Sequence, residues 1–198
     1  MTETSRKLLR PLVAALVLAV LTALVARVEL PVPGSPVPVS LQSLVVVLAG
    51  LVLGWRWGAI SMMIYVALGA LGLPVYADGA SGLDSLLGAT GGYLFGFVPA
   101  AAAAGGVAER ITSSSSLGRR LSGLTAAGLL AHVVIFGLGV PWLKIATEMS
   151  WSDALRHGCL PFLPGGVLKS VVAAGLALSI HHFSSFNPGR DHHENDTT

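Results

Sequence analysis

Charged residues are scarce in this chain. They make up 11% of its 198 residues, whereas 53% of the residues are hydrophobic. Soluble domains carry about 25% charged residues, so the composition excludes an ordinary soluble domain and indicates an integral membrane protein. The length favours a single domain. The net charge of +2 comes without a basic stripe, which gives no reason to expect a nucleic-acid partner.

The chain contains a single cysteine and lacks the common catalytic motifs. The single cysteine, Cys159, excludes an intrachain disulfide, and no Cys/His framework suggests a metal site. The sequence contains no GxSxG, HExxH or Walker A motif. We therefore predict no enzyme activity, no metal or other cofactor, and no ATP hydrolysis by this chain. Active transport would need an ion gradient or a partner subunit, and the lack of acidic residues for a proton relay within the membrane favours the partner.

Several apolar segments are long enough to be helices that span the lipid bilayer. They are residues 8–26, 41–54, 58–73, 91–108, 121–143 and 167–183. Most basic residues fall on the side of the N-terminus, so the positive-inside rule predicts that both termini are cytoplasmic. We expect an all-α bundle of six transmembrane helices over residues 1–186, followed by a polar tail, residues 187–198, that is disordered.

Lys169 is the only formally charged side chain in the last apolar segment. An ammonium group in hydrocarbon costs about 3 kcal/mol on insertion scales. Such a residue is tolerated where it reaches the interface, lines a wet cavity or meets an anion. The last two possibilities indicate a binding site.

The loops on the outer side are longer and less ordinary than the inner turns. Residues 27–40 contain four prolines, which predict an extended and stiff segment. Residues 73–92 are rich in glycine. We therefore expect substrate to be handled at the outer face.

Polar residues near these loops are candidates for ligand contacts. Glycines at positions 91 and 92 let backbone N–H groups approach a ligand, a helix N-terminus favours anions and polar acceptors, and Thr90 and Tyr93 add hydroxyls. The alternative is an ordinary helix start with Thr90 as the N-cap. Gln42 could bind a ligand or bridge two helices. Tyr65 and His132 lie in the middle of their segments, where we expect them to be satisfied interior groups.

The first segment carries Ala15, Ala19 and Ala23 at intervals of four. Such a stripe of small residues lets another helix approach closely in lipid. That helix could belong to a partner subunit or to the same chain.

Five segments in order resemble the BioY family, the biotin-specific S components of energy-coupling factor (ECF) transporters. They are PVPVSLQ at residues 36–42, LGWRWG at 53–58, YVALGALGLPVY at 65–76, GATGGYLFGF at 88–97, and PFLPG at 161–165 with Lys169. The resemblance implies a six-helix bundle in the bacterial plasma membrane, with biotin bound under the outer loops. It also implies a membrane-embedded T component and cytoplasmic ATPase subunits as partners, and it favours the alanine stripe as the surface that contacts the T component.

The resemblance also implies a set of ligand-binding residues. These are Gln42, Thr90, Gly91, Gly92, Tyr93 and Lys169. The biotin carboxylate could meet Lys169, and the ureido ring could bond to Gln42, Thr90 or Tyr93. Phe162, Trp142 and Tyr76 are candidates for the apolar wall around the thiophane ring.

Two positions depart from the family pattern. Ala89 replaces a proline, and Gly166 replaces an acid three residues before Lys169, on the same face of a helix. Either Asp78 or Asp84 folds in from its loop as a substitute, or the ligand differs. The alternative function is therefore an S-component-like or solitary transporter for another small carboxylate. A membrane enzyme or a purely structural membrane protein is disfavoured by the missing catalytic set.

Overall fold

The computed structural model describes residues 3–111 and 116–185, and these residues fold almost entirely into helices. The elements in order are α1 (Glu3–Val25), β1 (Glu29–Leu30), β2 (Val39–Ser40), α2 (Gln42–Ala70), η1 (Ala77–Gly79), α3 (Gly82–Leu87), α4 (Gly91–Ile111), α5 (Leu117–Thr147), α6 (Trp151–Gly158), η2 (Leu160–Phe162) and α7 (Leu163–Ser185). The predicted all-α membrane fold is confirmed. The predicted polar tail, residues 187–198, lies outside the described residues.

Helix α2 contains two of the predicted membrane segments, joined by a sharp reversal at Gly54. The backbone of Gly54 has φ 77° and ψ 179°, a conformation that only glycine adopts readily. A Cβ at Gly58 would lie 2.9 Å from the Cα of Gly50, although residues eight apart in a straight helix are about 12 Å apart. The chain therefore folds back on itself here. The sequence predicted this turn over residues 55–57, whereas the structure places the break at Gly54.

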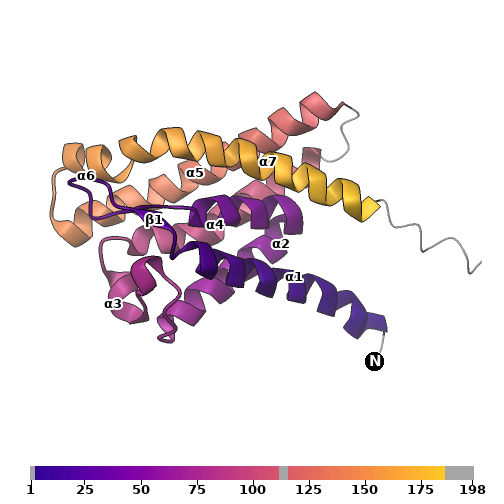
Figure 1. The fold of residues 1–198 in the computed structure, drawn as a ribbon, viewed down its shortest axis with the longest axis horizontal. Helices are drawn as coiled ribbons and strands as arrows, with labels where there is room; N and C mark the ends of the chain where they lie inside the picture. The colour runs from indigo at the N-terminus through magenta and orange to yellow at the C-terminus, as the bar shows by residue number, and fades with distance from the viewer. Residues whose placement is uncertain (1–2, 112–115, 186–198) are drawn as a thin grey trace, which may run out of the picture.

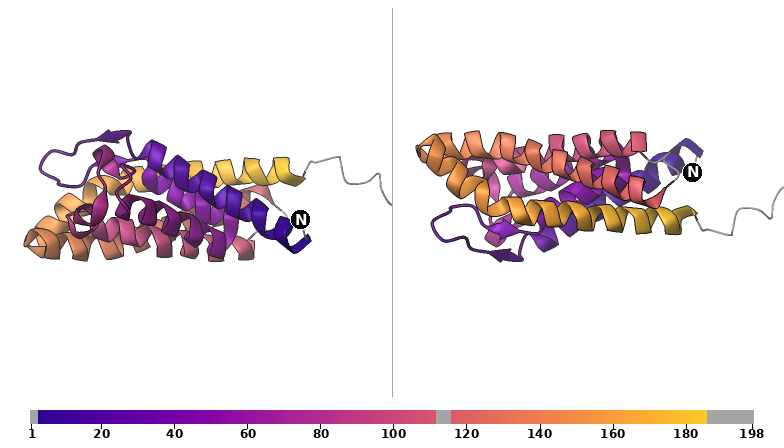
Figure 2. Two further views of the ribbon diagram at one scale, coloured as in Figure 1. Left: turned by 90° about the horizontal axis from the view of Figure 1, so that it is seen from below. Right: turned by 90° about the horizontal axis from the view of Figure 1, so that it is seen from above.

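Five helical stretches of the described chain are long and apolar enough to cross a membrane, and the break at Gly54 divides one of them. The six membrane segments run up and down, so the start of α1 and the end of α7 lie at the same end of the bundle (Figure 1). The opposite end carries the β1–β2 pair, α3 and α6, as the two rotated views also show (Figure 2). We call this the loop end. An even number of crossings agrees with the prediction that both termini are on one side.

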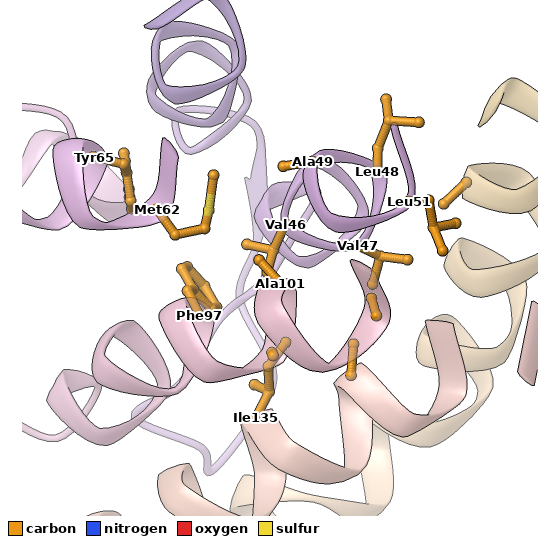
Figure 3. Packing of buried hydrophobic residues seen from close by; sticks show 14 of the residues in the cluster. Val46, Val47, Leu48, Ala49, Leu51, Met62, Tyr65, Phe97, Ala101 and Ile135 are labelled. Atoms are coloured by element: carbon orange, nitrogen blue, oxygen red, sulfur yellow. The ribbon is translucent and has the colours of Figure 1, made fainter. Parts of the chain in front are cut away.

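The core lies where α2, α4 and α5 meet (Figure 3). Val46 and Ala49 from the first half of α2 and Met62 from the second half pack around Phe97 and Ala101 of α4. These side chains are buried. A Cβ at Gly50 would meet Ala104 at 2.9 Å, so small residues allow α2 and α4 to approach closely.

The outer faces of α1 and α7 are continuous apolar surfaces. Large aliphatic side chains are exposed along both helices: Leu12, Val13, Leu16, Val17 and Val20 on α1, and Val167, Leu168, Val171, Val172 and Leu176 on α7. Faces of this size are a liability in water, and lipid covers them in a protein that crosses the membrane several times. The exposed apolar surface thus agrees with the scarcity of charge.

The loop end is more ordered than the sequence predicted. The first outer loop was expected to be only extended, but Glu29 pairs with Ser40 and Leu30 with Val39 in a short antiparallel ladder. The last outer loop contains α6 and η2, and α7 begins at Leu163 rather than at Val167. Lys169 therefore lies in the second turn of α7.

The alanine stripe of α1 packs against α2 of the same chain. Ala15 and Ala19 are fully buried, Ala23 is half-buried, and Ser61 Oγ donates a hydrogen bond of 2.8 Å to the carbonyl of Ala15. This is the packing within the chain that the sequence left open. Docking of a partner on the stripe stays a prediction, and it would require α2 to move away from Ala15 and Ala19.

Candidate functional site

A cavity opens at the loop end, between the outer loops and the ends of four long helices. Its walls come from β2 and α2, the segment from Tyr76 to Thr90, α4, α5, η2 and α7. Polar side chains line it at the β2–α2 junction and at a few other points, among them Ser85, Thr90 and His132, and aromatic and aliphatic side chains line the remainder. Segments distant in sequence thus form one pocket.

Lys169 reaches from α7 across the cavity to the start of α2. Its Nζ donates hydrogen bonds of 2.5 Å to the carbonyl oxygen of Ser40 and 3.2 Å to Oγ of Ser43. A lysine ammonium has three donors, so one N–H remains for a ligand. The side chain is half-buried and lines the cavity, where its ammonium group has two neutral partners.

Gln42 lines the same polar end of the cavity and also bridges two parts of α2. Its Nε2 donates to the hydroxyl of Tyr65 at 2.8 Å, and its Oε1 accepts from Ser40 Oγ at 3.0 Å. The Tyr65 hydroxyl in turn donates to the carbonyl of Val75. Tyr65 is thus a satisfied interior group, as predicted, and Gln42 keeps one amide N–H for a ligand.

Some residues at the start of α4 line the cavity, and others pack against neighbouring helices. Thr90 and Tyr93 line the cavity, although the Tyr93 hydroxyl already donates to the carbonyl of Gly158 at 2.8 Å. Gly91 and Gly92 do not line it. A Cβ at Gly92 would collide with Trp142 and approach the Leu138 carbonyl at 2.7 Å. Gly92 thus serves the close approach of α4 to α5, and Gly91 lies against the Leu86 backbone of α3.

Aromatic and aliphatic side chains form the larger, apolar part of the cavity. Tyr76 and Phe162, both predicted as wall residues, contribute to it. Trp142 does not, because its indole packs at α4, where Nε1 donates to the Gly88 carbonyl at 2.9 Å. The apolar lining that the sequence did not single out includes Val37, Leu94, Phe97, Ile135 and Phe136.

His132 is a cavity residue that the sequence did not identify as one. It lines the cavity from α5, and its ring lies against Gly166 of α7, where a Cβ would meet the ring at 3.2 Å. The sequence could have indicated this, since His132 is the only ionisable residue in the apolar segment 121–143. Like Lys169, it is a polar group within a membrane segment and needs a cavity or a partner.

Neither candidate for a substitute acid reaches the cavity. Asp78 and Asp84 are exposed in η1 and α3, and neither is among the residues that line it. The neighbour of Asp78 is Glu29, whose carboxyl pKa is raised by burial and by the nearby Asp78 carboxylate. The imidazole of His132, not a carboxylate, occupies the space beside Gly166.

The site can hold a small anion with an apolar body. One ammonium group and a few neutral donors and acceptors gather at one end, and aromatic side chains enclose the other. Among the described residues no cluster of His, Cys, Asp or Glu could hold a metal ion. These features are those of a binding pocket with a few oriented polar groups.

Comparison with known proteins gives consistent matches along the chain. The BioY family model matches residues 1–186. Two of the similar proteins are the biotin transporter BioY of Rhizobium etli, 37% identical over 147 residues that cover 73% of this chain and 78% of the relative, and that of Thermotoga maritima, 38% identical over 149 residues that cover 75% and 83%.

One solved structure shares the fold. It is the crystal structure of the S-component for biotin from an ECF-type ABC transporter, which aligns with a TM-score of 0.82 at 23% sequence identity. The alignment covers 92% of this chain and 95% of that protein. The helix arrangement described above is therefore that of a known membrane protein.

Proposed function

This chain belongs to the BioY family, and from that premise we propose that it is the biotin-binding membrane subunit of an ECF transporter. It captures biotin at the loop end and delivers it inward when ATP is hydrolysed by partner subunits. The single observation that carries the proposal is the cavity at the loop end with Lys169 as its one charged donor.

The chemistry of biotin fits the two parts of the cavity. Its valerate carboxylate is an anion, and the remaining N–H of Lys169 supplies a charge-assisted hydrogen bond. Its ring system is compact and largely apolar, and Tyr76, Phe97 and Phe162 provide a wall for it. The carbonyl of the ureido group is an acceptor, which the free amide N–H of Gln42 can serve.

The partners follow from what the chain cannot do alone. The sequence holds no nucleotide-binding motif, so energy for uptake against a gradient comes from separate ATPase subunits. A T component within the membrane couples those subunits to this chain. The exposed apolar face of α1, from Leu12 to Val20, offers it a surface that needs no rearrangement.

Uptake into liposomes tests the proposal. The chain is reconstituted alone, with a T component and ATPases, and with ATPases that cannot hydrolyse ATP, and tritiated biotin inside the vesicles is counted. We expect biotin binding in all three preparations and uptake only with active ATPases. Equal uptake by the chain alone would contradict the assigned partners.

Competition separates biotin from other small carboxylates. Lipoate carries a similar valerate chain but no ureido ring, so we expect it to displace biotin poorly. Displacement by lipoate at the same concentration as unlabelled biotin would favour the alternative substrate class.

A further inference from the structure

His132 lines the cavity and carries a buried ring nitrogen without a hydrogen-bond partner. The side chain is 5% exposed, lines the cavity from α5, and its Nε2 has no hydrogen-bond partner. An unpaired polar atom in such a place is costly unless a ligand or water satisfies it. Because the ring lines the cavity, a ligand bound there is the nearest available partner.

The other ring nitrogen fixes the tautomer. Nδ1 lies 3.0 Å from the carbonyl oxygen of Gly128, which can only accept a hydrogen bond, so Nδ1 carries the proton. Ser170 Oγ, 3.1 Å from Nδ1, donates its own hydrogen to the Gly166 carbonyl and can only accept from the ring. A second buried cation in the cavity that already holds Lys169 would be costly. The ring is therefore neutral, and Nε2 is an acceptor.

We propose that Nε2 of His132 accepts a hydrogen bond from an N–H group of the bound ligand. This rests on the proposed function, in which the donor is a ureido N–H of biotin. A ureido group has two N–H donors, whereas Lys169 and the free amide N–H of Gln42 supply only donors. His132 provides an acceptor and makes the pocket select for a ligand with an N–H group.

Gly166 makes this arrangement possible. A Cβ at position 166 would lie 3.2 to 3.7 Å from ring atoms of His132, including Nε2. A larger side chain would cover the nitrogen or push the ring aside. The glycine that breaks the family pattern and the histidine beside it thus form one feature of the pocket.

Two substitutions separate the binding role of His132 from its structural role. His132→Asn places an amide nitrogen near the position of Nδ1, which keeps the bond to Gly128, and removes the Nε2 acceptor. His132→Gln extends an amide oxygen toward the position of Nε2. Affinity for tritiated biotin and the melting temperature in detergent are measured for both variants and the wild-type chain.

We expect His132→Asn to bind biotin at least about tenfold more weakly, because the ligand loses a buried hydrogen bond, while its melting temperature stays close to that of the wild type. His132→Gln should stay within about threefold of the wild type. Methylation of the ureido nitrogen that donates to His132 Nε2 should weaken the binding of biotin to the wild-type chain. The same methylation should not weaken binding to His132→Asn.

The outcomes distinguish two failures. If the wild-type chain binds no biotin, the proposed function and this assignment are both wrong. If the wild type binds biotin and His132→Asn binds it equally well, only the assignment to His132 is overturned. If both variants lose affinity together with thermal stability, His132 acts on the fold and the assignment is again overturned.

Discussion

Replacing Lys169 by methionine removes one positive charge from the cavity and keeps most of the volume of the side chain. In the wild-type chain, Nζ is held by the Ser40 carbonyl and Ser43 Oγ at 2.5 and 3.2 Å. Both partners belong to the β2–α2 junction and both are neutral. The ammonium group is therefore oriented but not neutralised by these partners, and in the proposed complex the biotin carboxylate is its counter-ion.

The size of the effect follows because both partners that the described part of the chain gives Lys169 are neutral. Removing one member of a buried, hydrogen-bonded charge pair costs about 2–5 kcal/mol, because the other charge is left unpaired. This is a loss of roughly 30- to 5,000-fold in affinity. Lys169 is only half-buried, so we expect the loss to fall in the lower part of that range.

The assay is equilibrium binding of tritiated biotin and, in parallel, of its neutral amide. The wild-type chain should prefer biotin over the amide, whereas Lys169→Met should bind both with the same low affinity. Ser43→Ala is the matched control, since it removes one bond to the lysine but no charge, and we expect it to lose less than about tenfold. Melting temperatures for all three chains show whether the pocket is intact.

Two results would refute this reasoning about Lys169. One is wild-type affinity for biotin in the Lys169→Met chain. The other is a wild-type chain that binds biotin and its amide equally well. In either case the ammonium group would serve only to hold the β2–α2 junction, and the carboxylate would lie elsewhere.

Three further predictions concern the scaffold. Tyr65→Phe leaves the buried Gln42 amide without its partner and should lower the free energy of unfolding by about 1–3 kcal/mol, measured by denaturation in detergent. Gly54→Ala forces a side chain into the left-handed region at φ 77° and should cost about 1–3 kcal/mol, measured the same way, whereas an unchanged value would contradict the sharp reversal. The Glu29 pKa is raised above 4.5 by burial and by Asp78. Ionisation of Glu29 therefore destabilises the folded chain as the pH rises from about 4.5 through the Glu29 pKa. Glu29→Gln should therefore raise the melting temperature at pH 7, and the gain should disappear below about pH 4.

The membrane segments could be predicted from sequence because lipid imposes a simple rule of length and apolarity. The sharp turn was placed close to its true position because the apolar segments 41–54 and 58–73 leave only residues 55–57 between them. The order at the loop end could not be predicted, since α6 and the β1–β2 pair depend on contacts such as Ser35 Oγ with the His157 carbonyl at 2.7 Å. Such contacts join residues that are distant in the sequence.

The candidate site was predicted in part, and the reason differs from residue to residue. Lys169 stood out because a charge within a membrane segment needs an explanation. Gly91 and Gly92 were assigned to the ligand, but a glycine-rich helix start looks the same whether it approaches a ligand or the side chain of Trp142. His132 was expected to be satisfied, and only the three-dimensional arrangement reveals that one of its nitrogens is bonded and the other is not.

Equilibrium dialysis of tritiated biotin against the purified chain, without any partner subunit, tests the central claim most directly. We predict saturable binding at one site per chain, with competition by unlabelled biotin and little competition by lipoate. Absence of saturable binding in a chain that is folded by its melting curve would contradict the claim that this cavity is a biotin site.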